Sequence, residues 1–359
     1  MSNTTTTRML RAYVQMAAPT LFLSGFFKSP PENFYNTEKV EIDIERSEED
    51  VSIVITDLSQ GYRMNADDLY TNKSFLPPIN KEAGAINAFD MIKRQVGQNP
   101  FDNPNFQANA ILQSFKRFRK FEGKIKRSRE LQGSQILQSG IVSLVDSAGI
   151  VLYTIDYKPK ATHFPTVVID WDSASSTKAK DLEGLADTIR ADGLADPQTL
   201  VFDDLAFSDF INDSSIQALL NNRRINIGSI RPQSRGAGAT YQGEIAIGNY
   251  VFQMWTYNGR YKHPQTGVST KFMQPNKVIM LDDMARLDAT FGAIPKIVPP
   301  EARALPFLPP RISDGAAGVD LSTNAWVTAD GEQVFVGAGI RQLLIPTAID
   351  TYGCLTTKN

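Results

Sequence analysis

The chain has 359 residues, of which 42% are hydrophobic and 21% charged, with 37 basic against 39 acidic side chains. This length predicts two or three domains, and the apolar content supports a sizeable core, which excludes wholesale disorder. The near-neutral charge excludes a strongly basic nucleic-acid binder, no apolar run approaches the roughly 18 residues of a membrane-spanning helix, and the single cysteine, Cys354, excludes an internal disulfide framework.

The N-terminal region is unusually apolar for a chain terminus. Residues 8–16 have the spacing of a short amphipathic helix, and a strongly apolar segment follows at 21–27. The large apolar side chains of this arm segment are Leu21, Phe22, Leu23, Phe26 and Phe27. Two interpretations stay open: the segment packs on the body of its own chain, or it also docks on a neighbouring subunit.

A protruding loop is predicted next. Residues 38–45 alternate between apolar and polar side chains, as in a half-buried strand, and residues 51–55 alternate again. The stretch 61–78 is long and polar, and such loops are uncommon in compact domains unless they are functional. We therefore predict two strands joined by a long polar tip.

Residues 88–137 form the largest helical block. A short helix opens it, and a second helix begins at Asn103-Pro104, with apolar residues recurring every three or four positions. A helix over 104–137 would be about 50 Å long at 1.5 Å per residue. Two glycines, Gly123 and Gly133, weaken it and could bend or end it.

The same helix carries a basic cluster, opposed only by Glu122. Its members are Lys116, Arg117, Arg119, Lys120, Lys124, Lys126, Arg127 and Arg129. Two interpretations stay open here too. The cluster is the solvated face of a long helix, or it makes an electrostatic contact with nucleic acid or an acidic partner, where such side chains neutralise phosphates without reading sequence.

From about residue 170 the pattern changes to α/β. We predict a hairpin over 141–157, a helix over 172–191 capped near Ser175 or Ser176, and a buried strand at 200–202. Two short helices within 203–220, paired strands over 245–257 and a strand at 278–281 are predicted next. The chain then continues with an irregular proline-rich segment at 293–312 and one or two strands within 326–350.

The chain offers little catalytic chemistry. We expect His163 at a strand end or interface, His263 in an exposed hairpin tip, and Cys354 as a small buried hydrophobe. Three carboxylate pairs are read as helix caps and solvated turns rather than metal ligands: Asp170/Asp172, Asp203/Asp204 and Asp282/Asp283. No nucleophile, base and orienting group come together. We therefore expect a protein that is not an enzyme and has no cofactor and no metal site.

Two segments resemble one family. Leu21-Phe22-Leu23-Ser24-Gly25-Phe26-Phe27, followed by Thr37-Glu38-Lys39-Val40, is similar to the N-terminal signature of phage lambda-type major capsid proteins. Phe272-Met273-Gln274-Pro275-Asn276-Lys277-Val278 is similar to a later motif of that family. The order of elements matches along nearly the whole chain, apart from the segment 293–312.

The resemblance implies an α+β fold of the Hong Kong 97-like phage capsid type. The implied parts are an N-terminal arm (1–46), an extended loop, or E-loop (47–86), a peripheral domain (87–169 and 322–359, with a spine helix at about 104–137) and an axial domain (170–321).

The resemblance also implies a function. The chain would be the major capsid protein that self-assembles as hexamers and pentamers into the icosahedral head of a tailed double-stranded DNA phage. Its implied partners are other copies of itself, a decoration protein, scaffolding and portal proteins during assembly, and packaged DNA bound non-specifically, without a membrane. It would reside in the virion and be assembled in the host cytoplasm.

Intersubunit contacts are expected from the arm segment and from the extended loop. The expected loop contacts are charged at Asp67, Asp68 and Lys73 and apolar at Tyr70 and Phe75. The basic cluster would face the shell interior or the DNA. Two alternatives remain: an encapsulin-like compartment shell without DNA, and a cytosolic metal-dependent enzyme that uses the aspartate pairs.

Overall fold

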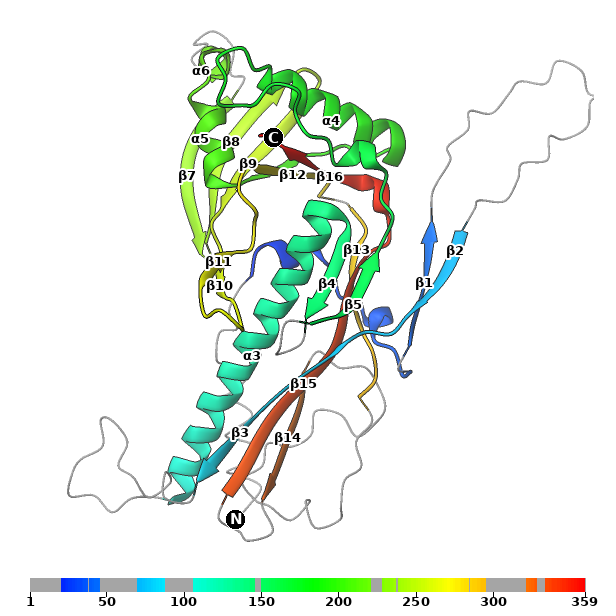
Figure 1. Cartoon of the computed structure of the whole chain (residues 1–359), viewed down its shortest axis with the longest axis vertical. Helices are drawn as coiled ribbons and strands as arrows, with labels where there is room; N and C mark the ends of the chain where they lie inside the picture. Colours follow the sequence, from blue (N-terminus) through cyan, green and yellow to red (C-terminus); the bar gives the residue numbers. More distant parts are fainter. Residues whose placement is uncertain are drawn as a thin grey trace, which may run out of the picture.

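One long helix and two β-sheets organise the chain (Figure 1). The structure is a computed structural model that describes residues 21–37, 39–45, 70–87, 106–145, 150–220, 228–236, 238–283, 285–294, 321–327 and 333–358. Within these ranges, every helix is too short or too polar to cross a membrane.

The long helix α3 (Phe106–Ser139) confirms the helix predicted over 104–137. Apolar side chains recur along the face that it buries, as an amphipathic helix requires. These are Phe118, Phe121, Ile125, Ile136 and Leu137. The helix continues through Gly123 and Gly133, so neither glycine ends it. It ends before Gly140, whose φ of 69° is the left-handed conformation that glycine commonly adopts after a helix.

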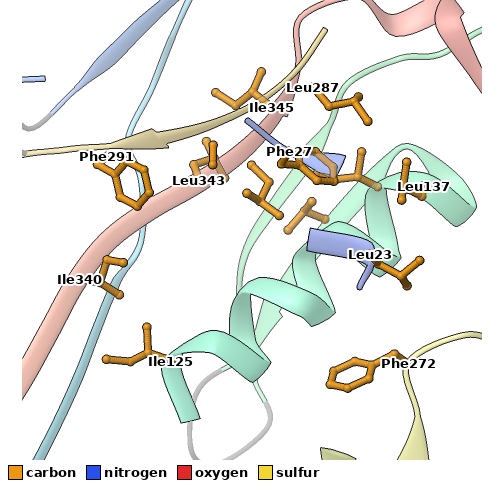
Figure 2. Packing of buried hydrophobic residues seen from close by; sticks show 14 of the residues in the cluster. Leu23, Phe27, Ile125, Leu137, Phe272, Leu287, Phe291, Ile340, Leu343 and Ile345 are labelled. Carbon is orange, nitrogen blue, oxygen red and sulfur yellow. The ribbon is translucent and has the colours of Figure 1, made fainter. Parts of the chain in front are cut away.

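The first sheet has four strands and is organised around the 14-residue strand β15 (Gln333–Pro346). β3 (Ile79–Asn87), β13 (Leu287–Phe291) and β14 (Ser322–Val327) all pair with β15 in antiparallel fashion. α3 packs on this sheet, and Figure 2 shows part of the apolar core between β15 and the helix.

The second sheet has six strands in the order β16-β12-β6-β9-β8-β7. Their bounds are β6 (Thr199–Phe202), β7 (Gly228–Gly236), β8 (Ala239–Ile247), β9 (Tyr250–Tyr257), β12 (Lys277–Leu281) and β16 (Tyr352–Thr356). Only β6 and β9 run parallel; the other neighbours are antiparallel. The helices α4 (Lys178–Gly193), α5 (Asp204–Ile211) and α6 (Ser214–Leu220) cover one face and enclose a second apolar core (Figure 1).

Three two-stranded ribbons lie outside these two sheets. β1 (Val40–Glu45) pairs with β2 (Tyr70–Phe75) and extends away from both sheets in Figure 1. β4 (Ile141–Val145) and β5 (Val151–Asp156) form the hairpin that the sequence predicts after the long helix. β10 (Arg260–Lys262) and β11 (Ser269–Lys271) form a short hairpin below β9 in Figure 1.

Each of the two sheets contains strands from more than one of the segments that the resemblance implies. β3, expected mostly in the extended loop (47–86), belongs to the four-stranded sheet. β13, expected in the axial domain (170–321), belongs to the same sheet, whereas β16, expected in the peripheral domain, pairs with β12 in the six-stranded sheet. A strand belongs to the sheet that satisfies its backbone N–H and C=O groups, and these long-range pairings leave no trace in local sequence patterns.

Two local predictions need correction. The partner of β1 is β2, within the stretch 61–78 that was expected to be a polar tip. α4 begins at Lys178 with Thr177 at its N-cap, one residue beyond Ser176, and the Thr177 side chain makes no capping hydrogen bond, so the side-chain cap predicted near Ser175 or Ser176 is not formed. The elements predicted at 8–16, 51–55 and 88–97, and nearly all of 293–312, lie outside the described residues.

Candidate functional surfaces

The arm segment packs into the core of its own chain. Leu23 and Phe27 are 0% and 5% exposed, and Figure 2 shows both among the side chains that surround α3. Leu21, Phe22 and Phe26 are half-buried. The Phe22 ring lies with its centroid 5.2 Å from that of Trp255 and 5.5 Å from that of Tyr257. This packing agrees with the first interpretation of the arm; docking on a neighbouring subunit stays a prediction.

A buried carboxylate holds the arm segment at its root. Glu130, on α3, is 0% exposed, and its carboxylate oxygens accept hydrogen bonds from the backbone N–H groups of Leu23 and Ser24, both at 2.8 Å, and of Phe22 at 3.2 Å. The Tyr257 hydroxyl also donates to this carboxylate, at 2.6 Å. Burial, and then the Glu130 charge, raises the pKa of Tyr257 well above its usual range. The sequence analysis missed this residue, because a glutamate within a charged helix resembles a surface residue.

Residues after the arm segment continue along the four-stranded sheet. The Lys28 N–H donates to Leu287 O at 2.8 Å, and the Ala289 N–H donates to Lys28 O at the same distance. Further along, the Phe34 ring stacks on Phe291 at 4.6 Å between centroids. The segment that leads to β1 is therefore bound to β13 before the ribbon leaves the body.

The extended-loop residues are placed only in part. Asp67 and Asp68 lie outside the described residues. Tyr70 and Lys73 occupy the first and fourth positions of β2, opposite Glu45 and Ile42 of β1. Phe75, at the base of the ribbon, is half-buried, and its ring centroid lies 5.9 Å from that of Tyr157. The apolar contact of Phe75 is thus with its own chain.

The basic cluster divides into an inward group and an exposed group. Arg129 donates from Nε to Gln342 Oε1 at 2.7 Å, and its guanidinium lies 5.2 Å from the centroid of the Phe291 ring. Lys126 forms an ion pair with Glu122 at 2.8 Å, and Arg117 is half-buried with a buried Nε. These three side chains take part in packing within the chain.

The remaining five basic side chains are exposed on α3. They are Lys116, Arg119, Lys120, Lys124 and Arg127. Lys124 forms an ion pair with Glu82 of β3 at 2.7 Å. The other four follow helical spacings of three, four and eleven residues from the first, so they share one face. We call Lys116, Arg119, Lys120 and Arg127 the basic face.

The aspartate pairs have structural partners. Asp203 caps the start of α5 by accepting from the Leu205 N–H, and Lys271 forms ion pairs with both Asp203 and Asp204. Burial and the Asp204 carboxyl raise the pKa of Asp203, and the Lys271 ammonium partly offsets this rise.

The other two pairs also have a partner each. Asp283 accepts from the Thr199 hydroxyl at 2.5 Å, and Asp172 forms an ion pair with Lys358 at 2.5 Å. Across the described residues, no three His, Cys, Asp or Glu side chains gather as a metal site would require.

The remaining titratable candidates are structural as well. His163 is fully buried between β16 and α4, with Nδ1 2.9 Å from Tyr352 O and Nε2 3.1 Å from Asp192 Oδ2. His263 lies in the β10–β11 hairpin, as predicted, but is half-buried rather than exposed. Cys354 is buried as predicted, and burial raises the pKa of its thiol to about 12.

Comparison with known proteins gives a family and a fold. The family model described as phage major capsid protein E matches residues 5–351. A structure assigned as a prophage capsid protein of Escherichia coli CFT073 is 15% identical, with a TM-score of 0.65, covering 97% of this chain and 98% of its own. A phage-related protein from Bordetella bronchiseptica RB50 is 11% identical, with a TM-score of 0.52, covering 97% and 96%. No curated protein matches the chain in sequence.

Proposed function

The chain belongs to the phage major capsid protein E family, and from this premise we propose that its copies assemble as hexamers and pentamers into a closed icosahedral head around packaged double-stranded DNA. The chain has the Hong Kong 97-like capsid fold. It is a structural shell protein of a tailed phage, assembles with other copies of itself into capsomers, and resides in the virion.

The match of the family model over residues 5–351 is the observation that carries this proposal. That range includes the arm segment, the ribbon, α3 and nearly all of both sheets. A shared fold alone would be weaker support, because one fold hosts many unrelated functions. The family, rather than the fold, therefore favours a phage head over an encapsulin-like compartment.

The interfaces between copies are proposed to involve the arm and the ribbon. Residues 1–20 precede the buried root of the arm in the sequence, and residues 46–69, with Asp67 and Asp68, connect β1 to β2. A ribbon of two strands presents unpaired backbone edges to a neighbouring molecule. Obligate interfaces are large and mainly apolar, which suits an arm whose residues 8–16 have the apolar spacing of an amphipathic helix in the sequence.

The basic face of α3 is proposed to meet packaged DNA at the inner surface of the shell. Exposed lysines and arginines neutralise phosphates and read no sequence. Four such side chains per copy, on a chain whose formal net charge is −2, give a weak contact repeated over many copies. Such a contact holds DNA without trapping it, because the affinity of each copy stays low.

Other partners are proposed by analogy with lambda-type phages. Scaffolding and portal proteins would take part in assembly in the host cytoplasm, and a decoration protein would brace the finished shell. Copurification of these proteins with assembling particles is the expected sign of each.

Nuclease treatment of particles isolated from the host tests the enclosure of a genome. We expect double-stranded DNA of uniform length to stay protected until the shell is disrupted, with this chain as the main protein. Particles of the same shape that contain a protein cargo and no protected DNA would support the encapsulin-like alternative instead.

A further inference from the structure

The root of the arm is built around one buried negative charge. Three consecutive backbone N–H groups, from Phe22 to Ser24, converge on the two carboxylate oxygens of Glu130, and Tyr257 from β9 supplies a fourth donor. Among the described residues, no lysine or arginine forms an ion pair with this carboxylate. Hydrogen-bond donors of the arm and of Tyr257 therefore satisfy its oxygens.

Such an arrangement restricts the direction of the arm. A buried carboxylate requires hydrogen-bond donors, and hydrogen bonds to a charged group are among the strongest in proteins. Three consecutive N–H groups can point at one carboxylate only in a tight turn, and residues 23–26 form a short 3-10 helix. The backbone at Leu21, where residues 1–20 join the body, is therefore held at a defined position and angle.

The same carboxylate connects three parts of the chain. It belongs to α3, its backbone donors belong to the arm, and Tyr257 belongs to the six-stranded sheet. One turn further along α3, the arm passes close to the helix: a Cβ at Gly133 would lie 3.3 Å from the Phe27 ring and 3.5 Å from Ser24 Cα. A movement of the six-stranded sheet relative to α3 would therefore displace Tyr257, one of the hydrogen-bond donors to Glu130 at the root of the arm.

We propose that Glu130 is a positioning residue for assembly, which sets the point and direction from which residues 1–20 leave the body to contact a neighbouring copy. This inference rests on the proposed role of the arm in assembly. On this proposal, Glu130 determines the geometry of the contact between copies, although residues 1–20 make the contact itself.

Amide hydrogen exchange on the full-length unassembled protein tests the first half of the proposal. Glu130→Gln should raise the exchange rates of the Leu23 and Ser24 amides about 10-fold or more, because the amide side chain carries no charge and turns its NH2 group either toward the N–H groups of Phe22 and Leu23 or toward that of Ser24. Amides in the middle of α3 should keep their protection. Glu122→Gln, about two turns earlier on the same helix, is the matched control and should leave the arm amides unchanged.

Shell yield tests the second half. Met9→Asp with Tyr13→Asp in the full chain places charges at two of the apolar positions predicted to share one face of 8–16, and should lower the yield of closed shells. Glu130→Gln should lower the yield by a similar factor, and combining all three changes should add little, since both act on one contact. Glu122→Gln should assemble normally.

The outcomes separate the inference from the function on which it rests. If the arm variant loses shells while Glu130→Gln exchanges rapidly at the arm root and still assembles fully, the positioning role is wrong and the arm contact stands. If the arm variant itself assembles fully, the arm contact fails, and the inference fails with it. Unchanged exchange at Leu23 and Ser24 in Glu130→Gln would also overturn the inference.

A milder variant covers the case in which Glu130→Gln does not fold. Tyr257→Phe removes one donor to the carboxylate and keeps the ring that packs against Phe22. It should raise arm-root exchange by a few fold, less than the loss of the charge would, and lower shell yield in proportion. No change in either quantity would contradict the proposal.

Discussion

Lys178 and Asp213 form a largely buried ion pair between the first residue of α4 and the turn before α6. Their side chains are 6% and 11% exposed, and the Nζ–Oδ2 distance is 3.0 Å. Burial would raise the pKa of Asp213, but hydrogen bonds from Ser215 and Lys178 outweigh it and lower the pKa from 3.8 to about 2. The pair therefore stabilises the folded state only while the carboxyl is ionised.

The pH dependence of unfolding should show this pair. An unfolded Asp213 titrates near 3.8, so its stabilisation is fully present above that pH and is lost as the pH falls through about 2. We expect Asp213→Asn to lower the free energy of unfolding at pH 7 by about 3 kcal/mol, because it leaves the Lys178 charge buried without its partner. The variant should also show a shallower loss of stability between pH 4 and 2. Denaturant titrations of unassembled protein measure both effects.

An exposed ion pair serves as the control for the buried pair of Lys178 and Asp213. Arg190 and Asp196 are 58% and 59% exposed, so Asp196→Asn should cost less than about 1 kcal/mol and leave the acid profile unchanged. Equal effects of the two asparagine variants would contradict the account of the buried pair.

Among the elements, α3 follows most directly from the sequence. Its apolar spacing gave the predicted span 104–137 and the observed span is 106–139, because periodicity is a local property of the chain. The hairpin after it and the strands β6 and β12 follow for the same reason. The partner of β1 was missed because β2 is polar and has no alternation. A ribbon paired only with itself needs no apolar face.

The sequence identified the residues of the functional surfaces but not which of them are exposed. Their residues could be found in the sequence, but burial divided the basic cluster into an inward and an exposed group, which helical spacing alone does not reveal. Glu130 was missed because its partners lie about a hundred residues away or more along the chain. Contacts across such distances depend on tertiary packing and leave no local pattern.

The two glycines of α3 should respond oppositely to the same substitution. A Cβ at Gly123 would meet only the flexible Arg127 guanidinium, at 3.5 Å, whereas Gly133 lies against Phe27, Leu344 and Ser24 Cα. We expect Gly123→Ala to stabilise the protein by up to about 1 kcal/mol through helix propensity. Gly133→Ala should destabilise it by up to about 2 kcal/mol, because overpacking at the arm root outweighs the same gain in propensity. Thermal unfolding measures both; a gain in stability for Gly133→Ala would show that the arm is not held tightly against α3.

The basic face should affect DNA more than shell formation. Arg119→Glu, Lys120→Glu and Arg127→Glu together should reduce the DNA retained per particle after a salt wash, because like charges then face the phosphates. Shell yield should stay near that of the wild type. Lys180→Glu, Arg235→Glu and Lys262→Glu change the same number of exposed charges outside α3 and serve as the control. Equal DNA content in the two triple variants would mean that the basic face is only solvated.

In the whole molecule, one apolar core is shared by both sheets. It contains Leu343 and Ile345 of β15 together with Val201 and Ile279 of the six-stranded sheet. The arm root adds a polar connection, since Glu130 of α3 accepts a hydrogen bond from Tyr257 of the six-stranded sheet. A subunit whose sheets share a core can transmit a change in one sheet to the arm, and the arm is the part proposed to contact a neighbour.

Electron microscopy of the purified assembled protein, with light scattering to give particle mass, tests the central claim most directly. We predict closed icosahedral shells of hexamers and pentamers, with α3 presenting the basic face to the interior and each arm leaving its subunit beside Glu130 toward a neighbour. A monomer or dimer at high concentration, without rings or shells even in the presence of its scaffolding protein, would contradict the account.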